Sequence, residues 1–64
     1  MNQLTTKELS AIEDQLYHEQ NLISKFQSYA DSSFDTQLKN RYNEAASKHQ
    51  KHYNALYSLI NQCL

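Results

Sequence analysis

Two histidines and one glutamate are the residues of this chain best suited to chemistry. His49 and His52 stand three residues apart in the second half of the chain, so a helix would place them one turn apart on the same face. Glu19 stands in the first half, within an otherwise apolar stripe. Two imidazoles and one carboxylate form a ligand set that suits zinc, iron or manganese. The three residues are therefore a candidate metal site, provided that the fold brings them together.

The composition indicates that helices must position these side chains. The chain has 64 residues and contains neither glycine nor proline, on which tight β-turns depend. We therefore predict an all-α fold and a single domain over residues 1–64. A chain of this length has a marginal core of its own, and its one cysteine allows no internal disulfide. Small chains of this kind are usually stabilised by a metal or by oligomerisation.

The first helix is predicted over residues 6–30. Thr5 followed by Glu8 is the sequence of a capping box, and Leu4 and Leu9 occupy the flanking positions of a hydrophobic staple. Residues at helical spacing then form a stripe that faces a partner helix. This stripe contains Leu9, Ile12, Leu16, Glu19, Ile23, Phe26 and Ala30.

The second helix is predicted over residues 36–61, with Asp35 as its N-cap. The turn formers Asp31, Ser32 and Ser33 separate it from the first helix. We expect Phe34 to cover the end of the core next to this turn. The stripe of the second helix contains Leu38, Tyr42, Ala45, His49, His52, Leu56, Leu59 and Cys63.

Two helices of similar length with a short connection predict an antiparallel helical hairpin. If Ala30 lies near Leu38, the antiparallel register places Phe26 opposite Tyr42 and Glu19 opposite His49, with His52 one turn further along. The polar interruptions of the two stripes then meet at one level.

Apolar residues beside the two stripes would stay exposed on a single hairpin. Pairing two hairpins into a four-helix bundle would bury them. We therefore predict a homodimer. The flanking residues are Leu22, Tyr29, Ala46, Tyr53 and Ile60.

Two interpretations of the Glu19, His49 and His52 cluster remain open at this point. The cluster could hold a metal ion, or it could be a metal-free polar group in which the histidines donate to Glu19 and fix the helix register. The third histidine, His18, falls off the stripe and is expected in solvent. Cys63 is expected to make a terminal apolar contact, with an intermolecular disulfide or a metal thiolate as alternatives. The five tyrosines indicate packing or, alternatively, oxidative cross-linking in an assembly.

Charge and hydropathy argue against several classes of partner. The formal net charge is -1, which favours neither nucleic acid nor an anionic membrane. No stretch approaches the roughly 20 apolar residues of a membrane span. The start of the sequence lacks the basic and apolar regions of a secretory signal. We expect a protein that is soluble where it is made, with a second copy of the chain as its first partner.

Several segments resemble the small spore coat proteins of the Coat F type, a ferritin-like helical family of spore-forming Firmicutes. The likeness rests on Glu19-Gln20 in the first helix, on Asp35 to Lys39 at the start of the second, and on the closing pair His49 and His52. It extends from about Leu4 to Ile60. The resemblance implies a ferritin-like bundle, synthesis in the cytoplasm of a sporulating cell, a place in the spore coat and other coat proteins as partners. It implies no established enzymatic activity. His49 stands where the family pattern has a glutamate, which argues against di-iron chemistry of the ferritin kind.

These observations lead to one expected function and one alternative. The expected function is a non-enzymatic structural component of the bacterial spore coat, with a candidate metal site in the bundle core. The alternative is a ferritin-like, metal-dependent redox protein, a ferroxidase or a peroxide-consuming bundle, that uses Glu19, His49 and His52. Zinc, iron and manganese are the candidate metals. The small number of carboxylates at the site favours zinc or a single iron over a di-iron centre.

Overall fold

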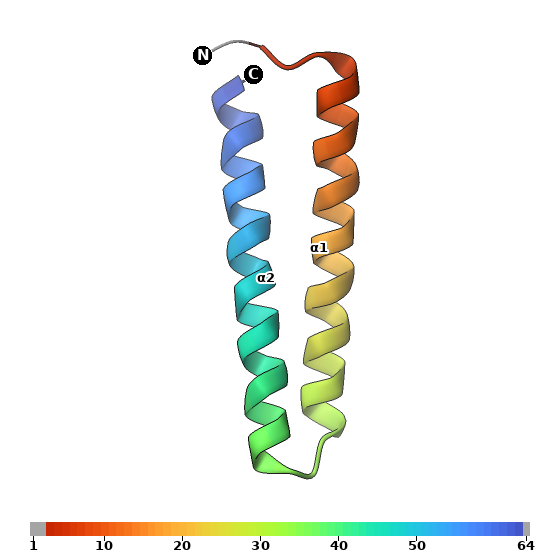
Figure 1. Cartoon of the computed structure of the whole chain (residues 1–64), viewed down its shortest axis with the longest axis vertical. Coiled ribbons are helices and arrows are strands. Elements are labelled where there is room, and N and C mark those ends of the chain that lie inside the picture. Colours follow the sequence, from red (N-terminus) through yellow and green to blue (C-terminus); the bar gives the residue numbers. More distant parts are fainter. Residues whose placement is uncertain (1–2, 64) are drawn as a thin grey trace.

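The computed structural model describes residues 3–63, which form two α-helices. Helix α1 spans Thr6–Ser32 and helix α2 spans Thr36–Cys63. The helices lie side by side and antiparallel, so that the start of α1 and the end of α2 are at the same end of the molecule (Figure 1). This arrangement confirms the predicted all-α hairpin. Each helix ends two residues later than predicted.

Side-chain caps fix where both helices begin. At α1 the Glu8 amide donates to Thr5 Oγ1 (3.1 Å), while the Thr5 amide donates to Glu8 Oε1 (2.9 Å). The hydrogen bond from the Thr5 backbone holds the pKa of the Glu8 carboxyl below its ordinary value. At α2 the Leu38 amide donates to Asp35 Oδ1 (2.9 Å). The predicted capping box and the predicted N-cap are therefore both confirmed.

The two helices touch along a single seam and bury little between them. Four of the described residues are less than 9% exposed: Glu19, Ala30, Ala46 and Cys63. None of these carries a large apolar side chain, and the larger seam residues such as Leu16, Ile23 and Phe26 are only half-buried. One layer of two helices has no second layer to cover its faces. The hairpin is accordingly a thin rod of 47 × 16 × 10 Å.

Helix α2 is turned slightly about its axis relative to the predicted stripe. Ala46, which was predicted to flank the stripe, is 5% exposed, whereas Leu38, predicted within it, is 45% exposed. His52 is likewise exposed, while His49 is half-buried. The physical reason is the small side chain of Ala46, which allows close approach of the helices when it faces the seam.

The prediction that Phe34 covers the end of the core is wrong, because its side chain is fully exposed. Ala30, in the last turns of α1, is only 1% exposed, so the helices already close this end without a large ring. The connection between the helices comprises three residues, 33–35. Ser33 turns the chain there, donating from its hydroxyl to the Tyr29 carbonyl (2.6 Å), and Phe34 is left outside.

Neither of the two helices, over the residues that the structure describes, has both the length and the apolarity needed to cross a bilayer.

Replacing Asp35 with alanine is expected to destabilise the hairpin by about 1 kcal/mol, because it removes the acceptor for the Leu38 amide at the start of α2. Urea denaturation followed by circular dichroism measures this change. Asp31→Ala is the matched control, since Asp31 is an exposed aspartate in the last turn of α1 and its loss should alter stability by no more than about 0.5 kcal/mol. Equal effects of the two substitutions would contradict the capping role.

Candidate metal centre

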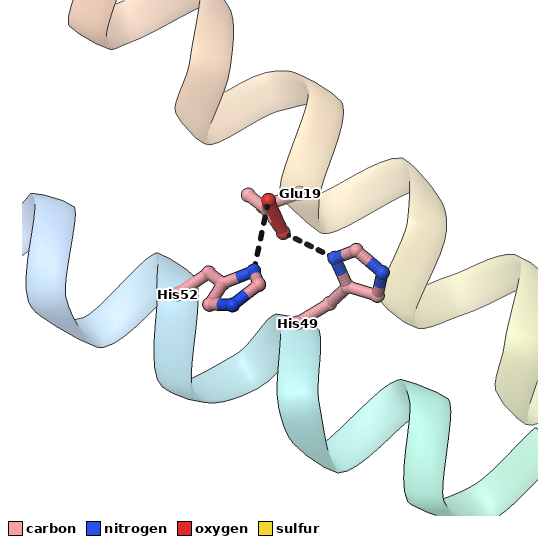
Figure 2. A group of neighbouring side chains, drawn as sticks. All are labelled: Glu19, His49 and His52. Atoms are coloured by element: carbon pink, nitrogen blue, oxygen red, sulfur yellow. Dashed lines mark hydrogen bonds and ion pairs between the residues drawn. The ribbon is translucent and has the colours of Figure 1, made fainter.

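The three predicted ligands meet at mid-height of the hairpin. Glu19 is the central residue of α1, and His49 lies at the centre of α2. Figure 2 shows the Glu19 carboxylate reaching from α1 toward both imidazoles of α2. Phe26 stacks on Tyr42 with ring centroids 6.2 Å apart. The predicted antiparallel register, with Glu19 opposite His49 and Phe26 opposite Tyr42, is therefore confirmed.

Each carboxylate oxygen of Glu19 contacts one histidine. Glu19 Oε2 lies 2.7 Å from His49 Nδ1, and Glu19 Oε1 lies 3.5 Å from His52 Nδ1. An ionised carboxylate can only accept a hydrogen bond, so His49 Nδ1 is the donor across the shorter distance. The Glu19 side chain is 5% exposed, that of His49 is 23% exposed and that of His52 is 49% exposed. The cluster therefore has a buried carboxylate and one open side at His52.

Burial and the histidines act on the Glu19 carboxyl in opposite directions. Burial alone would raise its pKa, since it disfavours the charged form. The hydrogen bond with His49 and the charges of His49 and His52 lower the pKa, with a smaller contribution from Gln15. The lowering effects prevail together, so the pKa of Glu19 lies below its ordinary value. The folded state thus favours an ionised carboxylate at the centre of the seam.

Two further residues complete the cluster, and neither was predicted in this role from the sequence. Gln15 Nε2 donates to Glu19 Oε1 (3.3 Å) from one turn earlier in α1. The ring of Phe26 stacks on His49 with centroids 5.7 Å apart and planes 17° apart. Gln15 could have been identified from the sequence, because it stands four residues before Glu19 and therefore one turn away on the same face of the helix. Both neighbours restrict the orientation of the candidate ligands.

The donor atoms are close enough to share one ion. One ligand atom from each of Glu19, His49 and His52 lies within 4.8 Å of the other two. Tetrahedral zinc has bonds of about 2.0–2.1 Å to nitrogen and oxygen, which separates neighbouring ligand atoms by about 3.3 Å. The distance of 2.7 Å between Glu19 and His49 is that of a hydrogen bond. Binding would therefore remove the bridging proton and open this pair by about half an ångström.

Other predicted candidates lie away from the cluster. His18 is exposed, as expected. Cys63 is a buried free thiol that lines a small depression with Gln3, Leu4 and Leu9. Eleven residues separate Cys63 from His52, or about 16 Å along a helix. Cys63 is too far away to bind the same ion as His52 within one chain, and its surroundings favour the apolar contact.

Comparison of the chain with protein-family models, with curated proteins and with solved structures gives no match.

The stability of the metal-free hairpin is expected to fall in acid because of Glu19. A carboxyl with a lowered folded-state pKa contributes stability that is complete above its unfolded pKa, about 4.3, and is lost as pH falls through the folded value. Urea denaturation between pH 6 and pH 2 should therefore show a steeper decline for the natural chain than for Glu19→Gln. Glu13→Gln, at an exposed glutamate of the same helix, is the control. Identical acid profiles for the natural chain and Glu19→Gln would contradict this role.

Proposed function

We propose that this protein is a non-enzymatic structural subunit that binds one divalent transition metal ion per cluster and dimerises into a four-helix bundle. Following the resemblance described above, we propose the bacterial spore coat as its setting, with other coat proteins as partners. The observation that carries the metal function is the convergence of Glu19, His49 and His52, which come from two helices. The ion would join these helices at mid-height and so act as a brace.

The chemistry of the donor set favours zinc. Two imidazole nitrogens and one carboxylate oxygen suit a borderline ion, whereas magnesium and calcium prefer sites made of oxygen alone. One carboxylate leaves a bound divalent cation with a net positive charge. A pair of iron ions would require more carboxylates than each chain supplies here. Three protein ligands also leave a coordination position open.

The limited burial of the hairpin supports dimerisation. In the part of the chain that the structure describes, the buried residues are small or charged. Tyr29, Leu38 and Tyr57 are between 44% and 52% exposed. A core of this size supplies little stability for a chain of 64 residues. Association with a second copy would cover part of this apolar surface.

Metal binding is expected to require both histidines of the cluster. Titration of the metal-free protein with zinc(II), followed by native mass spectrometry, should show one ion bound per chain. His49→Ala and His52→Ala should each weaken binding at least 100-fold, because only two protein ligands remain. His18→Ala is the matched control and should bind like the natural chain, since His18 is exposed and outside the cluster. Failure of the natural chain to bind zinc, iron(II) or manganese(II) would refute the proposal.

A second candidate function is metal-dependent redox chemistry, either ferroxidase activity or peroxide consumption. The observation that favours it is the open side of the cluster at His52, whose side chain is 49% exposed and leaves a route for small oxidants. The two functions differ in a direct measurement. The redox function requires that the iron(II)-loaded protein consume oxygen or peroxide faster than free iron(II) does, and that His52→Ala abolish this difference. A structural metal site shows neither effect.

The proposed setting predicts that the protein is found in spores. Quantitative immunoblotting of fractions from a sporulating culture of the source bacterium should recover most of the protein in the coat extract and little in the germinated cell. A cytoplasmic helical protein of similar size serves as the fractionation control. Absence from purified spores, together with a folded monomer at micromolar concentration in sedimentation analysis, would rule out the structural coat function.

A further inference from the structure

Contacts across the seam distinguish two long sides of the hairpin. On one side, Gln20 Nε2 donates to the Tyr53 hydroxyl (3.5 Å), and neutral polar side chains predominate among the lining residues of two adjoining grooves. On the other side, Gln15 and His52 both contact Glu19 Oε1. We call this second side the His52 face. By seven-residue spacing along each helix from Gln15 and His52, its residues include Leu22, Tyr29, Leu38, Ala45, His52 and Leu59.

The His52 face combines apolar character with exposure. Tyr29 and Leu38 are 44% and 45% exposed, although both are large and apolar. Leu22, Ala45 and Leu59 are half-buried. The groove side differs, since Ala46 is nearly covered there and the neighbouring Gln20, Gln27 and Gln50 are neutral amides that water solvates well. Part of the exposed apolar surface of the hairpin therefore lies next to the open side of the candidate metal site.

The area of the chain indicates how much surface an occupant should cover. Its accessible surface is 5043 Å². A compact monomer of 7.5 kDa is expected to expose about 4250 Å². The excess of about 800 Å² equals the area that each partner loses in a protein interface of standard size. If two copies pair, each can cover the excess accessible surface of the other.

The cluster lies at mid-height of the hairpin, where a symmetric second copy would bring its own cluster to the same level. Glu19 and His49 are each the fourteenth residue of their helix. Dimers of identical chains are usually two-fold symmetric. When two hairpins overlap fully with their long axes parallel, the symmetry axis runs either along them or across them at mid-height. In both arrangements the residues at mid-height of one copy lie level with the same residues of the other.

We propose that two hairpins pair through the His52 face, and that the second copy closes the open side of the metal site, so that metal binding and dimerisation strengthen one another. This inference rests on the proposed metal function. The physical cause of the coupling between metal binding and dimerisation is that the second copy removes water from His52 and from the bound ion. In a drier site the ion interacts more strongly with the Glu19 carboxylate, and the imidazole of His52 loses freedom to turn away.

Sedimentation equilibrium and zinc(II) titration on the full chain test this coupling. Zinc should lower the dimer dissociation constant at least tenfold. Tyr29→Lys, which puts a charge on the His52 face, should prevent dimerisation and weaken zinc binding. Because a dimer holds two ions and coupling is reciprocal, the loss of affinity per site should be the square root of the factor by which saturating zinc lowers the dimer dissociation constant. Leu38→Lys should act in the same way, and it avoids the contacts that Tyr29 makes with Phe26 and Tyr42. Circular dichroism confirms that each variant is helical.

The matched control is Tyr57→Lys. Tyr57 is 52% exposed and stacks on Tyr53, so it belongs to the groove side. This variant should dimerise and bind zinc like the natural chain. Loss of the dimer in Tyr57→Lys and its retention in Tyr29→Lys would overturn the choice of face. Equal zinc affinity for monomer and dimer would overturn the coupling and leave the proposed metal function intact, whereas absence of zinc binding to any form would refute the metal function itself.

Discussion

A carboxylate buried between two helices is the constraint on which this hairpin depends. Glu19 is almost inaccessible to water, and an ionised group in such a place destabilises the fold unless donors surround it. Helix α2 presents His49 and His52 at this level. A slip of one turn, about 5.4 Å, would bring Glu19 level with Ala45, which has no side-chain donor, or level with His52, which would leave His49 without its carboxylate partner. The cluster therefore selects one register, whereas the apolar contacts alone would tolerate several.

The same cluster connects local structure to the proposed function. Among the described residues the buried apolar side chains are the small ones of Ala30, Ala46 and Cys63, so the seam by itself supplies little stability. A metal ion would add bonds between α1 and α2, and a second copy would add apolar contacts. Both act at or beside His52, which is the exposed member of the cluster. This placement explains how a chain with a marginal core could become a durable part of a larger assembly.

Much of the fold and the candidate site could be predicted from the sequence. The caps at Thr5 and Asp35 follow from local hydrogen bonding, and the meeting of Glu19 with His49 follows from counting back along both helices from a short connection. The rotation of α2 and the exposure of Phe34 could not be predicted in this way. Both depend on how closely the helices approach at Ala30 and Ala46, which is a property of the packed pair. Metal binding, dimerisation and the spore coat remain proposals, because they depend on groups outside a single chain.

The short connection between the helices also sets an order for folding. The contact between Phe26 and Tyr42 spans 16 residues of sequence, and that between Glu19 and His49 spans 30. Contacts near the connection close smaller loops, so their formation costs less chain entropy. We therefore expect the two helices to pair first near the connection and last at the open end. Backbone amides near Leu9 and Leu59 would then exchange with solvent before those near Ala30. The cluster, halfway along, would then divide a protected segment from one that can open by itself.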